Sequence, residues 1–417
     1  MLAKKTKEFV AGRVFQSMSW LGGAELVNRL FRLVTTLTLA SYFSRAEYGL
    51  MAILYISLDF AFIFIRSGIT AKIVQADEDI LQTVCDTSYW INWIACTAAF
   101  SLQCLAAYPI SLIFGSTDLF LPLCFSALTY LLFPFFLVKS SLIERDNRMK
   151  EMAIIYSAQS IASNLMIAAL VIMDMGIWSI SLSMFFSTLI WFVVNTRETS
   201  WKAPKKFTSK EWKMIVNYSK SVMGVEFLNK FRSNIDYLIV GRVLGIDDLG
   251  FYYFAFSAGS GITMNIVNTF VWALYPHLCS IRAEPQKFRQ EYFKNLKVIM
   301  LSISMVVILQ SSLSHFYIPL IANGKWIPAI PILILICISV IPSTLKQLGS
   351  ILLNACDKPE TSLYFDIIYT IIFTLCIHLV VQHGVYWVAL SVLACHTLMG
   401  ISFSILSSKK AFSSSLG

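Results

Sequence analysis

A charged motif with the spacing G-x-E-x-x-N-[R/K] occurs twice inside apolar stretches of this 417-residue chain. The two copies occupy residues 23–29 and 224–230, at an offset of 201 residues. Ionisable residues are costly in a bilayer core and usually face a wet cavity or a protein interior. The duplication therefore predicts two homologous halves around a polar central cavity, which is how a transporter is built.

The cations of this motif are suited to binding an anionic group. On a helix, Arg29 and Arg32 share a face with Glu25, and Lys230 shares a face with Glu226. Arginine binds phosphate through two hydrogen bonds, and lysine binds it as a point charge. The predicted substrate-binding residues, which include one lysine of a later apolar segment, are Asn28, Arg29, Arg32, Asn229, Lys230 and Lys346. The alternative is that the motif forms internal ion pairs, Glu25–Arg29 and Glu226–Lys230, that hold the two halves together.

Carboxylates in the same apolar segments are candidates for carrying a proton or binding a coupling cation. The predicted ion-coupling residues are Glu25, Asp59, Glu226, Asp236 and Asp366. Arg232 points away from the motif face, and its spacing favours an ion pair with Asp236 at i+4. No G-x-x-x-x-G-K-[S/T] sequence is present, so transport would be driven by an ion gradient, a partner or the substrate gradient.

Membrane-spanning helices must position these residues. Hydrophobic residues make up 57% of the chain and charged residues 14%, whereas soluble domains contain about 25% charged residues. A span needs about 20 mostly apolar residues, and the first and seventh candidates are the least apolar because they carry the motif. Twelve segments qualify: 18–41, 48–67, 88–109, 118–138, 153–173, 177–195, 214–240, 250–275, 298–321, 328–353, 362–381 and 385–407. The sequence therefore predicts an all-α polytopic membrane protein with about twelve transmembrane helices.

The distribution of Lys and Arg predicts the orientation of the spans. Short cytoplasmic loops are enriched in Lys and Arg. With the N-terminus inside, 23 of these residues fall in cytoplasmic segments and 3 fall in external loops. Both termini are then cytoplasmic. The basic segment 196–213 is expected to link two six-helix lobes, residues 1–200 and 201–417, that are related by a parallel internal repeat.

Other classes of function are disfavoured. The nine cysteines are scattered singly and the five histidines lack ligand spacing, so we predict no metal site and no cofactor. The net charge of +9 is distributed over alternate loops rather than one soluble face, which argues against a nucleic-acid partner. The loop 276–297 is expected to be either a short interfacial helix or a solvated loop.

Three segments carry a resemblance to a known family. They are residues 44–49 (SRAEYG), 244–255 (LGIDDLGFYYFA) and 323–331 (NGKWIPAIP). On these segments and on the order of its spans, the chain resembles the polysaccharide-biosynthesis branch of the multidrug/oligosaccharidyl-lipid/polysaccharide (MOP) flippase superfamily. It departs from the branch in having twelve spans where many members have fourteen, and in reading Asn323-Gly324 where Phe-Gly is usual.

The resemblance implies a flippase for O-antigen or exopolysaccharide biosynthesis. Such a protein moves undecaprenyl-diphosphate-linked oligosaccharide from the cytoplasmic to the periplasmic leaflet of a bacterial inner membrane by ion-coupled alternating access. The implied partners are this lipid-linked oligosaccharide, membrane lipids, and a glycan polymerase with its chain-length regulator. The alternative is a multidrug or small-molecule exporter of the same superfamily, whose cavity is expected to be dominated by acidic and aromatic residues. An enzyme such as a polymerase or ligase would carry a long external loop, and the predicted external loops are short.

Overall fold

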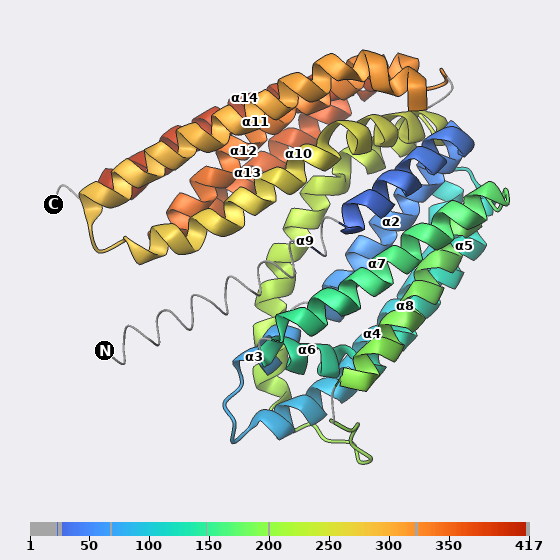
Figure 1. Ribbon diagram of the computed structural model, residues 1–417, viewed down its shortest axis with the longest axis vertical. Helices are drawn as coiled ribbons and strands as arrows, with labels where there is room; N and C mark the ends of the chain where they lie inside the picture. Colours follow the sequence, from blue (N-terminus) through green and yellow to red (C-terminus); the bar gives the residue numbers. More distant parts are fainter. Residues whose placement is uncertain are drawn as a thin grey trace. The chain divides into compact units, whose positions relative to one another are not determined.

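The computed structural model describes residue 23 and residues 27–66, 69–146, 148–198, 201–321 and 324–413. All regular elements in these ranges are helical (Figure 1). Residues 27–42 form the first described helix. The α-helices that follow are α2 (Arg45–Arg66), α3 (Ile69–Gln75), α4 (Leu81–Ile113), α5 (Phe120–Ala127), α6 (Leu137–Arg145), α7 (Met149–Ile172), α8 (Trp178–Glu198), α9 (Trp212–Val243), α10 (Ile246–Ser280), α11 (Pro285–Ile321), α12 (Ile330–Ala355), α13 (Pro359–Val380) and α14 (Val385–Phe412).

Nine helical segments of the described chain are long and apolar enough to cross a membrane. They correspond to the predicted second to sixth and ninth to twelfth spans, so the all-α polytopic fold is confirmed. They are Arg45–Gln75, Leu81–Ile113, Thr117–Phe135, Lys150–Ile172, Trp178–Arg197, Pro285–Leu320, Ile327–Ala355, Pro359–His383 and Val385–Phe412. The predicted first span lies partly outside the described residues.

The predicted seventh and eighth spans, α9 and α10, are long helices but are not among these nine. They contain 32 and 35 residues, which is more than a bilayer requires. The low apolarity of α9 follows from charged side chains that include Lys230 and Arg232, as the sequence predicts. The lower apolarity of α10 comes from its Gly, Ser, Asn and Tyr residues.

Helix α11 replaces most of the predicted loop 276–297. It contains 37 residues and would extend about 55 Å at 1.5 Å per residue, beyond a hydrocarbon core of about 30 Å. Its first turns are held by packing: Phe288 and Tyr292 are buried, and both rings contact Phe412 at the end of α14. This segment is therefore a continuation of a span, and neither a separate interfacial helix nor a solvated loop.

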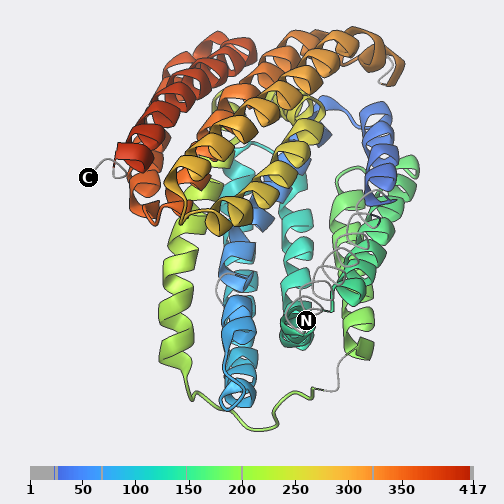
Figure 2. The same cartoon turned by 60° about the vertical axis from the view of Figure 1, so that its left-hand side comes forward.

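The chain forms two compact units, Met1–Phe231 and Arg232–Gly417, whose boundary falls within α9. The first half of α9 belongs to unit 1 because Ile215 is fully buried in a cluster with Ile73, Val84 and Val138 of α3, α4 and α6. The linker that joins α8 to α9 runs as an irregular segment at one end of this unit (Figure 2). The division of the two lobes at residue 200 stays a prediction.

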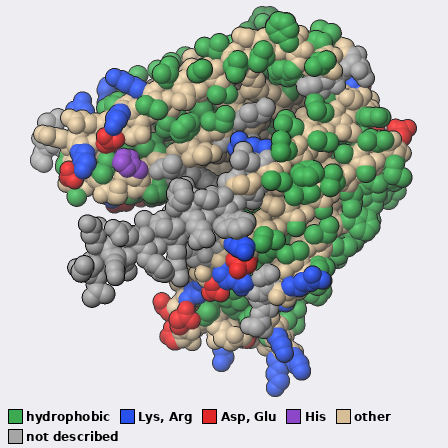
Figure 3. Space-filling model, viewed as in Figure 1, with side chains coloured by type: hydrophobic (Ala, Val, Ile, Leu, Met, Phe, Trp, Pro, Cys, Tyr) green, Lys and Arg blue, Asp and Glu red, His purple; other side chains and the backbone are tan. Residues whose placement is uncertain are grey.

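Helix α12 is the central helix of unit 2, where it packs against α10, α11, α13 and α14 (Figure 1). Apolar side chains cover much of the visible surface of both units, and charged side chains gather mainly where helices end (Figure 3). Leu301, Leu320 and Leu379 are 74–85% exposed. Such a surface is costly in water and suits contact with lipid.

Candidate substrate and ion site

A cluster of charged side chains from three helices lies inside unit 2. The guanidinium Nη1 of Arg232 on α9 is 2.9 Å from Oδ1 of Asp366 on α13. The ammonium of Lys346 on α12 forms an ion pair with the same carboxylate. The three side chains are only 12–18% exposed. One carboxylate therefore pairs with two cations in a largely enclosed site.

Aromatic rings surround this cluster. The guanidinium of Arg232 lies 5.7 Å from the ring centre of Tyr369, and the ammonium of Lys346 lies 5.9 Å from that of Phe403. His396 on α14 contacts the Tyr369 ring, and its Nδ1 lies 3.3 Å from the carbonyl oxygen of Ser339. Ring faces stabilise cations where water is scarce. The rings thus help to stabilise these two cations.

The prediction of an Arg232–Asp236 ion pair is wrong. Asp236 is buried at 3% exposure, and its Oδ2 accepts a hydrogen bond of 2.8 Å from the hydroxyl of Tyr252 on α10. Arg232 and Asp236 contact different neighbouring helices, so tertiary packing replaces the local i+4 pair. Asp236 is thus bound within the contact between α9 and α10.

A second cation–carboxylate pair lies in unit 1. Nζ of Lys230 on α9 is 3.0 Å from Oδ2 of Asp59 on α2. The two side chains are 38% and 41% exposed. Beside them, the rings of Phe60 and Phe227 pack at 5.6 Å between centroids. The Glu226–Lys230 pair, which was the alternative to substrate binding, is not formed: within the described residues Glu226 is exposed and makes no ion pair.

The remaining predicted residues lie on the first described helix and on α9. On helix 27–42, Asn28 is buried, Arg29 is half-buried and Arg32 is exposed. This helix is held on α7 by the Thr35 hydroxyl, which donates a hydrogen bond of 3.0 Å to the carbonyl oxygen of Asn164. Asn229 is half-buried on α9. Glu25 lies outside the described residues, and with it the predicted Glu25–Arg29 pair.

The structure thus brings together residues that the sequence assigned to separate roles. The predicted substrate-binding Lys230 and Lys346 pair with the predicted ion-coupling Asp59 and Asp366. Arg232 was not among the candidate site residues predicted from the sequence, because its i+4 spacing favoured an ion pair with Asp236. Its intramembrane charge, two residues after Lys230, was the signal that could have identified it.

The chain matches a family of polysaccharide biosynthesis proteins over residues 38–331. A relative in Bacillus subtilis (strain 168), the teichuronic acid biosynthesis protein TuaB, is 22% identical over 82% of this chain and 72% of its own length. The lipopolysaccharide biosynthesis protein WzxC of Escherichia coli (strain K12) is 21% identical over 87% of this chain and 74% of its own length.

A solved structure of the lipid II flippase MurJ, in an inward closed conformation, has the same fold. Its TM-score is 0.75 at 15% identity, and the match covers 94% of this chain and 88% of that one. At this identity the likeness concerns the fold. The family match extends over most of the chain and includes in full the three segments that carry the resemblance. The chain belongs to the polysaccharide biosynthesis protein family of membrane proteins.

Proposed function

We propose that this protein flips undecaprenyl-diphosphate-linked oligosaccharide repeat units from the cytoplasmic to the periplasmic leaflet of a bacterial inner membrane. The observation that carries the proposal is the pair of sites in which intramembrane cations are balanced by carboxylates, Lys230–Asp59 and Arg232–Lys346–Asp366. Family membership supports a role in polysaccharide biosynthesis. Both termini are proposed to be cytoplasmic.

The two cations that pair with Asp366 in unit 2 suit a diphosphate. The guanidinium of Arg232 can donate two parallel hydrogen bonds to a phosphate, and the ammonium of Lys346 adds a point charge. In the structure Asp366 pairs with both of these groups. The substrate phosphate would replace the carboxylate as their acceptor. Asn28, Arg29, Arg32, Asn229 and Lys230 are proposed to contact the same lipid-linked substrate.

The ion pairs also suggest how transport is coupled to an ion. A proton or sodium ion on Asp366 removes the negative charge that holds Arg232 and Lys346, so these cations bind phosphate more strongly. By linkage, bound substrate then favours binding of the ion. Asp59 is proposed to act on Lys230 in the same way. Glu226 and Asp236 have weaker support, because within the described residues neither forms an ion pair with a cation. Glu25 lies outside the described residues and stays a prediction.

The reaction proposed is translocation without covalent chemistry, so the protein is a transporter and not an enzyme. Its product, a lipid-linked oligosaccharide on the outer face of the membrane, is the substrate that a glycan polymerase requires. A polymerase and its chain-length regulator are therefore proposed as neighbours in the membrane. An exporter of cationic drugs would be poorly served by a site with two cations and one carboxylate.

The test is complementation of a deletion strain that has no second flippase, with surface glycan as the readout. Wild-type protein is expected to restore the glycan, whereas an Arg29→Ala/Lys230→Ala double variant and an Arg232→Ala/Lys346→Ala double variant are not. A Lys287→Gln/Lys294→Gln variant, altered in exposed helical ion pairs, is the control and should restore it. Unchanged surface glycan in the deletion strain would overturn the flippase proposal.

A further inference from the structure

The linker of residues 201–211 has a fixed path against α4. The hydroxyl of Thr87 donates a hydrogen bond to the carbonyl oxygen of Lys210, and the indole Nε1 of Trp90 donates one of 3.1 Å to that of Lys206. The ring of Phe207 packs on Trp90 at 5.6 Å between centroids. These contacts use backbone carbonyls and an aromatic ring, so the charged ends of the lysines are not required to hold the linker in place.

A cavity of about 460 Å³ lies between this linker and the first turns of α4. Pockets that bind small ligands typically measure about 300–1,000 Å³. Its lining contains three lysines and one aspartate, a net charge of +2 on the ionised side chains. The residues that line it are Thr83, Asp86, Pro204, Lys205, Lys206, Phe207, Thr208 and Lys210. The charge favours an anionic occupant.

Lys205, Lys206 and Lys210 are the three lysines that line the cavity. In the part of the chain that the structure describes, the ammonium groups of Lys205, Lys206 and Lys210 form no ion pair. Asp86, the acidic residue of the lining, accepts a hydrogen bond of 2.8 Å from the side-chain amide of Gln82. Three ammonium groups around one cavity repel one another, and a bound anion would relieve that repulsion.

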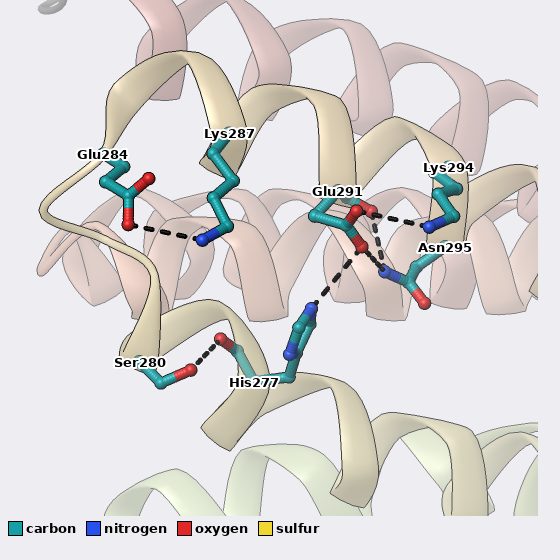
Figure 4. A network of polar contacts seen from close by, with 7 residues as sticks. All are labelled: His277, Ser280, Glu284, Lys287, Glu291, Lys294 and Asn295. Atoms are coloured by element: carbon teal, nitrogen blue, oxygen red, sulfur yellow. Dashed lines mark hydrogen bonds and ion pairs between the residues drawn. The ribbon is translucent and has the colours of Figure 1, made fainter.

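The turn between α10 and α11 is different, although it is also rich in lysine. There Lys287 pairs with Glu284 and Lys294 pairs with Glu291, each at 3.3 Å, and His277 lies 3.6 Å from Glu291 (Figure 4). A loop can therefore be rich in lysine and still pair its lysines with acidic residues. The contrast indicates that the charge at the linker is kept for a ligand.

Apolar side chains beside the cavity indicate that this ligand is an amphiphile. Phe207 is 65% exposed and Trp212, at the start of α9, is 47% exposed. Aromatic residues at span ends occupy the membrane–water interface, and lysines next to spans attract anionic lipid headgroups. We infer that this cavity binds the phosphate headgroup of an anionic phospholipid from the surrounding leaflet. The inference does not depend on the proposed flippase function.

The test measures binding of phosphatidylglycerol to the purified full-length protein in neutral detergent, with bound lipid counted by native mass spectrometry. A Lys205→Gln/Lys206→Gln/Lys210→Gln variant is expected to bind it on the order of 100-fold more weakly, since each lysine contributes to headgroup attraction. The control Lys287→Gln/Lys294→Gln should bind as wild type. Added NaCl should weaken wild-type binding, because salt screens exposed charges.

Two further probes identify the occupant. Phosphatidylcholine, which has no net charge, should bind poorly, and undecaprenyl diphosphate should not displace phosphatidylglycerol. Equal binding of phosphatidylcholine, or no loss in the triple variant, would overturn the inference. Displacement by undecaprenyl diphosphate with the same lysine dependence would assign the cavity to the substrate carrier instead. A Lys205→Gln/Lys206→Gln variant provides the comparison if the triple variant does not fold.

Discussion

At the scale of the residue, the two charged sites differ in how far they are removed from water. The side chains of Arg232, Lys346 and Asp366 are 12–18% exposed, whereas those of Lys230 and Asp59 are about 40% exposed. Removing one partner of a buried ion pair leaves an uncompensated charge, and this is far more destabilising than removing one partner of an exposed pair. The same substitution should therefore act differently at the two sites.

Asp366→Asn should lower the free energy of unfolding by about 3–5 kcal/mol, because Arg232 and Lys346 would both lose the buried carboxylate with which they pair. Asp59→Asn should lower it by no more than about 1 kcal/mol. Chemical denaturation in detergent micelles measures both values. Equal losses would show that Asp366 is not the buried counter-ion of two cations.

A second prediction at this scale concerns the buried Asp236. Tyr252→Phe removes the hydroxyl that donates to its carboxylate, and a buried group left without a partner costs about 1–3 kcal/mol. Thermal unfolding should show the loss. Tyr386→Phe, at a side chain that is 47% exposed, is the control and should leave the unfolding temperature unchanged.

At the scale of the element, a close contact between two helices of unit 2 depends on a small residue. A Cβ atom built at Gly400 on α14 would lie 2.3 Å from the carbonyl oxygen of Pro342 on α12. Small residues let helix backbones approach closely in membrane proteins, where packing replaces the hydrophobic effect as the driving force. Pro342 leaves α12 without one backbone donor, so this region of α12 is held mainly by its neighbours.

Gly400→Ala should therefore destabilise the protein by about 1–3 kcal/mol, because α12 and α14 must move apart. Gly261→Ala on α10 is the matched change, since a Cβ there meets nothing within 4 Å. It should be neutral or stabilise the helix by about 0.5–1 kcal/mol. The unfolding midpoints of the two variants measure this difference in stability. Similar midpoints would contradict the close packing of α14 on α12.

At the scale of the whole molecule, the arrangement of spans assigns each connection to one side of the membrane. The linker 201–211 and the end of α14 are proposed to be cytoplasmic. The turn that contains Ser116, between α4 and α5, and the turn at Gly384, between α13 and α14, are then external. All four positions lie at the ends of candidate spans, so the proposed orientation can be tested at each.

Green fluorescent protein inserted at Ala203 or fused after Phe412 should fluoresce, because it folds in the cytoplasm. Alkaline phosphatase inserted at Ser116 or Gly384 should be active, because it requires the external side of the membrane. Comparing both reporters at all four positions controls for expression. The reverse pattern at any position would contradict the orientation predicted from Lys and Arg.

The sequence by itself determined the class of the fold and the position of most spans. Hydropathy depends on local composition, so nine predicted spans correspond to apolar helices, and the low apolarity of α9 was visible before its structure. The motif also made Lys230 a candidate site residue, and the intramembrane charges made Asp59, Lys346 and Asp366 candidates, whose roles stay predictions. A charge in a bilayer-length helix requires a partner or a polar cavity wherever it lies.

Only the tertiary structure decided which charges meet. Arg232 and Asp366 are 134 residues apart in the chain, and Lys230 and Asp59 are 171 apart. Helical periodicity relates residues within a few turns, so it suggested Arg232–Asp236 and Glu226–Lys230 and could not predict either observed pair. In the same way, α11 continues to Pro285 because Phe288 and Tyr292 pack on Phe412 of α14, a contact that no local pattern encodes.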